Sequence, residues 1–352
     1  MQYNARMSAV SLDDASTEKK MTNTTLNTNT NTNTTTKTHS ESDVYDRQIR
    51  LWGAESQAKM QKSKVLYVHV TGVSAEVLKN LVLAGIKATL CDPRPVEEVG
   101  VHFFTPPKTV KKMKASSIAH SVKPLVEELN PLLGECPLLE KPCSELTEED
   151  LQEFTVVVAS KIPLEEAVRL AKLTTANGAQ FYVGDCFGLN GCAMIDLGKD
   201  FRYRPEQGKA LLDPVPLKEY VSLEDAVRVP LYQAVNRFHK TPPPVWVQYR
   251  CLMEHYQKTG SWPGENSDSE RSSKLLRAFL EEQKVTSMLD EELNTLIKAG
   301  MAQVAPVCAV LGGMLGNEII KVISGKGEPA NNTLLLNGSI CKAWTFLVKP
   351  KV

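Results

Sequence analysis

Residues 67–79, with the sequence YVHVTGVSAEVLK, lie where an apolar strand-like segment meets an apolar helix-like segment. In nucleotide-binding folds this junction carries a glycine-rich turn, which lets backbone amides approach a phosphate at the helix N-terminus. Only Gly72 remains here, and the side chains of His69, Thr71 and Ser74 would obstruct the phosphates. Because a bare helix N-terminus is a weak anion site, the sequence predicts a degenerate phosphate loop that binds no nucleotide of its own.

Other polar residues could support a nucleotide or a metal. Asp92 ends the second expected strand, where an acid could bind a ribose hydroxyl, but we favour a polar turn residue next to Pro93. His102 and His120 have no partners at the spacing of metal ligands, so we interpret them as structural and predict no metal site. A basic cluster could contact phosphates, although such clusters are usually solvated surface: Lys111, Lys112 and Lys114.

The eight cysteines include no CxxC pair, which argues against a zinc site. Cys308 lies in an apolar run at helical spacing, where a thiol is normally an inert part of the core. Cys186 follows the end of an expected strand, and we expect it to be more exposed. No histidine–aspartate constellation in the sequence supports a nucleophile at either position, so we expect no thioester on this chain.

The segments that must position these residues alternate between strand and helix patterns. Continuously apolar strands are expected over 64–70, 87–92, 154–160 and 180–185. Helices are expected between and after them, over 73–85, 114–131 and 163–178. This alternation predicts an α/β fold with a mostly parallel sheet and helices on both faces. A long apolar helix over 306–325 then precedes two further strands, over 332–338 and 342–349.

Composition divides the chain of 352 residues into four parts. Residues 1–43 are rich in Thr and Asn and have few large apolar side chains, so we expect a disordered tail. Residues 44–197 are the first part of the α/β domain, residues 198–300 a mostly helical insert, and residues 301–352 the return of the domain. Basic and acidic residues balance at 41 each, and no run reaches 18 apolar residues, so neither nucleic acid nor a membrane is an expected partner.

The tail leads into a predicted helix that ends at Gly53. Its apolar residues form one stripe at i, i+4 and i+7: Tyr45, Ile49 and Trp52. Asp43, or the serine before it, can cap its start. Asp43 and Arg47 have the i, i+4 spacing of an ordinary surface ion pair. The same spacing separates Asp46 from Arg50.

Several stretches together resemble the activating enzymes of ubiquitin and ubiquitin-like proteins. They are YDRQIRLWG, NLVLAGI, GDCFGLNG and PVCAVLGGMLGNEIIK followed by NNTLLLNG, and the resemblance covers residues 44–348. Short length, the degenerate turn and the APVCAVLGG helix are most similar to the smaller, non-catalytic subunits of SUMO-activating enzymes. The resemblance implies a Rossmann-like adenylation fold of the ThiF/MoeB type.

The resemblance also implies an obligate heterodimer. In this family the larger, catalytic subunit binds ATP and Mg, adenylates the C-terminal glycine of the modifier and captures it as a thioester on its own cysteine. The chain described here would bind no cofactor and would meet SUMO only through the complex. A largely nuclear location, possibly with a cytoplasmic share, is implied in the same way.

Two departures from the family pattern indicate the inactive half of such a pair. Active halves carry a GxGGxG turn, from which residues 69–74 depart. They also carry an arginine after the second strand, and Val101 stands at that position here.

One arginine of the family pattern is retained. The resemblance implies that Arg47, in YDRQ, reaches across the dimer to the ATP phosphates held by the partner. The chemistry is suitable, because a guanidinium is always charged and can fork onto the oxygens of departing pyrophosphate. The alternative is an ordinary surface ion pair, which we keep as the interpretation of Arg50.

Other functions fit the sequence less well. A regulatory subunit for another ubiquitin-like modifier tends to have a longer insert. A self-sufficient sulfur-carrier adenylyltransferase needs its own glycine loop and often a zinc CxxC pair, and a nicotinamide-dependent dehydrogenase needs GxGxxG after the first strand. A scaffold without a catalytic contribution differs from the first interpretation only in the role of Arg47.

Overall fold

The computed structural model describes residues 44–105, 117–208, 210–237, 240–264 and 267–350. The Thr/Asn-rich tail, the capping residues proposed for the first helix and the Lys111–Lys114 cluster lie outside these ranges. The described residues belong to one compact unit.

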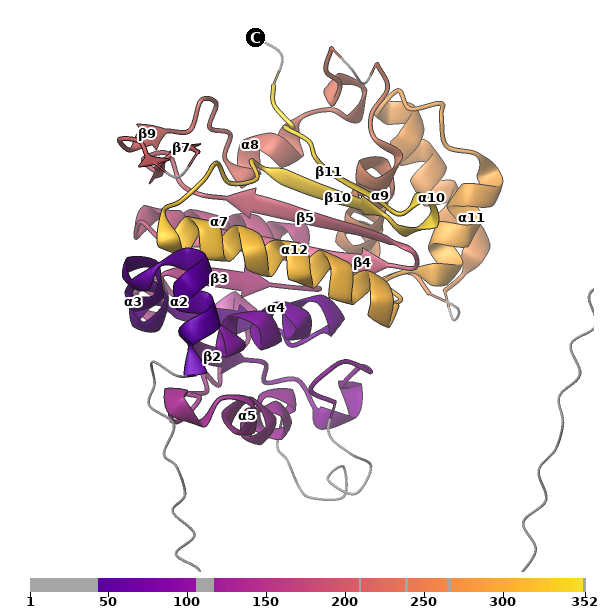
Figure 1. Ribbon diagram of the computed structural model, residues 1–352. Coiled ribbons are helices and arrows are strands. Elements are labelled where there is room, and N and C mark those ends of the chain that lie inside the picture. Colours follow the sequence, from indigo (N-terminus) through magenta and orange to yellow (C-terminus); the bar gives the residue numbers. More distant parts are fainter. Residues whose placement is uncertain (1–43, 106–116, 209, 238–239, 265–266, 351–352) are drawn as a thin grey trace, which may run out of the picture. The chain divides into compact units, whose positions relative to one another are not determined.

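A seven-stranded mixed sheet organises the chain (Figure 1). Its strands, in the order β11-β10-β5-β4-β3-β1-β2, are Lys342–Thr345, Thr333–Asn337, Asn190–Asp196, Gln180–Phe187, Val156–Ala159, Lys64–Val68 and Lys87–Cys91. β2, β1, β3 and β4 are parallel neighbours. β5 is antiparallel to β4 and to β10, so β10 has the direction of the parallel core, and only β5 and β11 oppose it. The predicted α/β fold with a mostly parallel sheet is confirmed.

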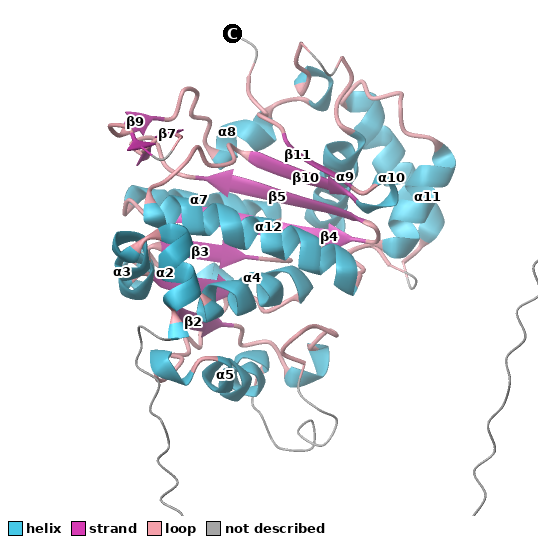
Figure 2. Cartoon of the chain, viewed as in Figure 1, coloured by secondary structure: helices cyan, strands magenta, loops and turns pink. Residues whose placement is uncertain are grey.

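Helices cover both faces of the sheet (Figure 2). On β1 the side chains of Val65 and Tyr67 join the core under one helical layer, while Leu66 and Val68 join the core under the other, as the period of a strand requires. The first layer contains α3 Ala54–Lys62, α4 Gly72–Leu83, α5 Ile118–Leu129 and α12 Ala305–Ser324. The second contains α6 Glu148–Leu151, α7 Leu164–Ala176, α8 Leu223–Arg228, α9 Pro244–Thr259, α10 Ser269–Glu282 and α11 Asp290–Ala299.

Strand β5 was not predicted. The strand predicted over 180–185 runs on to Phe187, and β4 and β5 form a long hairpin. Gly184 on β4 and Gly191 on β5 lie against α12, where an added Cβ would be 2.8 Å from Leu315 Cδ1 and 2.9 Å from Leu311 Cδ2, so these leucine side chains would have to shift. The glycines therefore mark a close approach of a helix to the sheet, which is one of the reasons that strands tolerate glycine.

Helix α12 is the centre of its layer and lies beside α4 (Figure 1). Among the described helices it has the length and hydropathy of a membrane span, but 61% of that window is buried inside the fold, as in the core helix of a globular protein. Its paired glycines differ in role. A Cβ on Gly312 would lie 2.4 Å from Glu76 Cβ, whereas one on Gly313 would meet nothing closer than 4.0 Å. Gly312 thus serves packing within the fold.

The segment 198–300 is more varied than the predicted helical insert. It begins with two small antiparallel ribbons formed by β6 Arg202–Tyr203, β7 Glu206–Gln207, β8 Ala210–Leu211 and β9 Val215–Pro216. Helices α8 to α11 follow, and their buried residues share one core with β3 and β4. The expected loop between α9 and α10 is present over residues 260–268, of which 265–266 are not described.

Candidate functional site

The turn between β1 and α4 keeps a backbone shape that glycine normally supplies. His69 has φ 65°, in the left-handed region that non-glycine residues adopt at a cost in free energy. The Thr71 amide donates to Ser74 Oγ at 2.8 Å, and that hydroxyl donates to the carbonyl of His69 at 2.8 Å. Side chains of the turn therefore fold back on its own backbone instead of leaving it open.

Three successive amides of this turn are occupied by groups of the chain itself. The Val70 amide donates to Asp92 Oδ2 at 2.7 Å, the Thr71 amide donates to Ser74 Oγ, and the Gly72 amide donates to Gln303 Oε1 at 2.7 Å. Amides at such a helix N-terminus are the donors that a phosphate would use. An anion here would have to displace a buried carboxylate, a hydroxyl and an amide oxygen.

The side chain of Asp92 is fully buried at the end of β2. Its Oδ1 accepts from Arg94 Nε at 2.8 Å and its Oδ2 from Arg94 Nη2 at 2.7 Å, in addition to the amide of Val70. Both oxygens are engaged in this bidentate pair. The geometry favours the turn interpretation over a free carboxylate waiting for a ribose hydroxyl.

Two histidines border this turn without forming a metal centre. Burial, together with the positive charge of Arg94, lowers the pKa of His69 to about 4. Burial likewise lowers the pKa of His102 to about 4. His120 instead contacts Glu140 Oε1 at 3.0 Å on the surface of α5. Within the described ranges, no three His, Cys, Asp or Glu side chains gather as metal ligands would.

A buried polar network below the turn was missed by sequence reasoning. Asp185, at the predicted end of β4, accepts from Ser160 Oγ at 2.9 Å, from the Lys161 amide at 2.6 Å and from Tyr249 Oη at 2.9 Å. Ser160 Oγ in turn lies 2.5 Å from Thr71 Oγ1. Burial raises the pKa of Asp185, and these donors oppose that shift. The network joins β3, β4 and α9 to the turn; the only sequence signal was an acid at the end of an apolar strand.

The expectation of an exposed Cys186 is wrong. Cys186 is fully buried because β4 continues past Asp185 into the hairpin, which places the thiol under α12. The hydrogen bond with the Cys308 thiol, together with burial, raises the pKa of Cys186. Cys308 is buried in α12, as expected for a core thiol. Of the eight free cysteines only Cys341 is exposed.

Arg47 lies on the exposed side of the short helix α2 Asp46–Trp52. Its neighbour Arg50 forms the expected surface pair, with Nη2 2.9 Å from Asp46 Oδ2. Over residues 44–350, where described, no ion pair or hydrogen bond engages the Arg47 guanidinium; its other expected partner, Asp43, is outside those ranges. Val44 and Leu51 flank it at i−3 and i+4 and are 45% and 72% exposed.

Val101, which stands where the phosphate arginine of active halves would fall, is exposed. Val101 is 86% exposed in the loop after β2. Nearby, Phe103 packs edge-on against Phe104 and is covered by Lys79, whose Nζ lies 4.8 Å from the ring centroid. A valine here supplies no charge to an anion.

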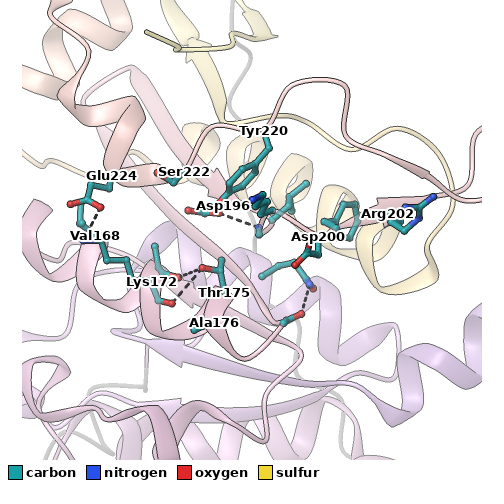
Figure 3. A pocket seen from close by; sticks show the side chains of 17 residues that line it. Val168, Lys172, Thr175, Ala176, Asp196, Asp200, Arg202, Tyr220, Ser222 and Glu224 are labelled. Atoms are coloured by element: carbon teal, nitrogen blue, oxygen red, sulfur yellow. Dashed lines mark hydrogen bonds and ion pairs between the residues drawn. The ribbon is translucent and has the colours of Figure 1, made fainter.

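A cavity of about 660 Å³ lies at the opposite end of the parallel strands, between the start of β4, the end of β5 and the C-terminal turn of α7 (Figure 3). Several of its charged side chains are engaged within the fold. Asp196 accepts from Tyr220 Oη at 2.9 Å and from the Leu223 amide at 2.8 Å, and Lys172 pairs with Glu224 at 2.7 Å. Neither the residues of the β1–α4 turn nor Arg47 line this cavity.

Comparison with known proteins connects these features. The sequence model described as the ThiF family matches residues 45–349. The chain belongs to the ThiF family. The matched region begins at the helix that carries Arg47 and includes the β1–α4 turn, the segment 198–300 and α12.

Curated relatives give a narrower placement within the ThiF family. The chain is 30% identical to SUMO-activating enzyme subunit 1 of Xenopus laevis, over 85% of this chain and 93% of that protein. It is 33% identical to SUMO-activating enzyme subunit 1B-1 of Arabidopsis thaliana, over 83% and 91%. It is 28% identical to subunit 1 of Dictyostelium discoideum, over 85% and 90%. The resemblance to the smaller subunits of SUMO-activating enzymes is confirmed.

Proposed function

We propose that this chain is the regulatory subunit of a heterodimeric SUMO-activating enzyme. The catalytic partner binds ATP and Mg, adenylates the C-terminal glycine of SUMO and captures it as a thioester. The chain described here completes the partner's site with Arg47 and binds SUMO only through the complex. The relatives named SUMO-activating enzyme subunit 1 support the reaction and the division into subunits.

The observation that carries this proposal is the self-occupied turn between β1 and α4. The amides of Val70, Thr71 and Gly72 all donate to side chains of the same chain. Displacing the buried carboxylate of Asp92, the buried hydroxyl of Ser74 and the half-buried amide oxygen of Gln303 would cost free energy that a phosphate must recover, because each acceptor would lose its hydrogen bond. This geometry supports a chain that holds no ATP of its own.

The outward face of α2 supports the transfer of Arg47 to the partner. Val44, Arg47 and Leu51 lie at i, i+3 and i+7 and are exposed together. An arginine between exposed apolar side chains is typical of protein interfaces, where arginine is enriched and lysine is depleted. A guanidinium delivered in this way can stabilise the charge that grows on pyrophosphate as the carboxylate attacks the α-phosphorus.

The burial of Cys186 and Cys308, the two thiols singled out in the sequence, supports a thioester on the partner. Cys308 is buried in α12, and Cys186 is buried beneath it on β4. A thiol that attacks an adenylate must be accessible and readily ionised. We place the complex in the nucleus, possibly also in the cytoplasm, without nucleic acid or membrane as partners.

Reconstitution tests this function. The chain is expressed alone and together with the catalytic subunit of a SUMO-activating enzyme, and ATP–pyrophosphate exchange is measured with SUMO and with another ubiquitin-like modifier. We expect no ATP binding or exchange by the isolated chain, and SUMO-dependent exchange by the complex. Tight ATP binding and unaided exchange by the isolated chain would contradict the proposal; exchange only with the other modifier would reassign the substrate.

A further inference from the structure

The helix that carries Arg47 is held mainly at its two ends. None of the seven residues of α2 is buried, so packing of the helix itself fixes its direction only weakly. A helix of this length is also unstable in isolation, because the cost of nucleation is not recovered in two turns. Contacts at the ends of α2 must therefore set where Arg47 points.

The N-terminal contact is made by Tyr45, which precedes α2. Its ring is buried, and its hydroxyl accepts a hydrogen bond from Asn130 Nδ2 at 2.9 Å. The same nitrogen donates to the carbonyl of Val82 at 2.7 Å, so the hydroxyl joins a buried network. The ring lies against Gly85, where a Cβ would be 3.0 Å from Tyr45 Cζ. Gly85 therefore leaves room for the Tyr45 ring, and its φ of 89° is a backbone conformation that glycine adopts readily.

The C-terminal contact is made by Lys326, in the turn that follows α12. Lys326 Nζ donates to the carbonyl of Trp52, the last residue of α2, at 2.7 Å. A cation at this position also interacts favourably with the negative end of the helix dipole. Tyr45 and Lys326 thus tie the two ends of one short helix to two separate parts of the fold: the buried side chain of Asn130 and the turn after α12.

We propose that Tyr45 and Lys326 are positioning residues for Arg47, an inference that rests on the function proposed above. Charge stabilisation by a donor held in place depends on its geometry, and a misplacement of about 1 Å can reduce a rate by about 10²-fold. If either end of α2 is loosened, the helix no longer holds Arg47 in the orientation in which it contacts the partner's phosphates. The guanidinium itself is unchanged.

The test uses the reconstituted heterodimer with SUMO and saturating ATP. Tyr45→Phe removes the hydroxyl and keeps the ring, and Lys326→Met removes the charge and keeps most of the stem. Each is expected to lower the maximal rate of ATP–pyrophosphate exchange by roughly 3- to 10-fold, a part of the loss that full misplacement would cause. Tyr67→Phe is the matched control, because the buried Tyr67 hydroxyl has no hydrogen-bond partner among the described residues, and it should leave exchange unchanged.

A double-mutant cycle separates positioning from general stability. If Tyr45 acts through Arg47, Tyr45→Phe causes no further loss in an Arg47→Ala background. The same fold loss in both backgrounds would overturn the inference, as would wild-type exchange by both Tyr45→Phe and Lys326→Met. If Arg47→Ala itself exchanges at the wild-type rate, the proposed role of Arg47 is refuted instead, so the two failures are distinct.

Discussion

The two adjacent glycines of α12 should respond to the same substitution in opposite directions. Gly312 faces α4, where an added Cβ would lie 2.4 Å from Glu76 Cβ and 3.0 Å from the carbonyl oxygen of Val73. Nonbonded carbons prefer a separation of about 3.5–4.0 Å, so the contact is too short by about 1 Å. Neither atom can rotate away, because one is the first carbon of its side chain and the other belongs to a helix backbone.

The expected magnitudes follow from these contacts. Overpacking a well-packed core costs about 1–3 kcal/mol, and replacing glycine by alanine inside a helix returns up to ~1 kcal/mol. Since the contact at Gly312 involves unyielding atoms, Gly312→Ala should destabilise the chain by about 1–2 kcal/mol net. Gly313→Ala meets nothing closer than 4.0 Å and should stabilise it by about 0.5–1 kcal/mol.

Urea denaturation followed by tryptophan fluorescence measures both variants. The midpoints should lie on opposite sides of the wild-type midpoint, with unchanged slopes. A Gly312→Ala variant as stable as the wild type would mean that α4 and α12 are not held as close together as described. Equal destabilisation by both substitutions would show that the glycines act through the helix backbone and not through the contact with α4.

Three further predictions concern the site. Arg47→Ala should raise the barrier to ATP–pyrophosphate exchange by the heterodimer by ~2–4 kcal/mol, which is about 30- to 1,000-fold in rate, while Arg50→Ala leaves exchange unchanged; equal effects would refute a special role for Arg47. Because burial lowers the pKa of His69 and His102 to about 4, the unfolded chain binds more protons than the folded one below pH 6.5. The free energy of unfolding should therefore fall as the pH drops from 6.5 to 4, by up to ~1.4 kcal/mol per pH unit for each histidine. His69→Asn, which tolerates the left-handed backbone, should flatten this dependence, and denaturation curves at several pH values measure it. Finally, non-reducing gels of the active heterodimer should carry the SUMO thioester on the partner and none on this chain.

Much of the fold follows from local patterns. The strands of the parallel core and the helices between them have periodicities of two and 3.6 residues that the sequence carries within each segment. Strand β5 was missed because neither Gly184 on β4 nor Gly191 on β5 indicates a strand locally. Both pack beneath α12, more than 100 residues away in the chain. The same hairpin buries Cys186, whose exposure was predicted wrongly.

The sequence by itself determined that the phosphate loop had lost its glycines, because the residue types at the β1–α4 turn are visible in a single stretch. It also identified the family through short motifs that include Arg47. Only the tertiary structure decided what fills the turn. Asp92, directly after β2, accepts a hydrogen bond from the Val70 amide, and Gln303, before α12, accepts one from the Gly72 amide. Likewise, only the folded chain joins Tyr45 to Asn130 and Lys326 to Trp52. Hydrogen bonds between distant residues depend on where the whole chain places them, and no local pattern encodes that placement.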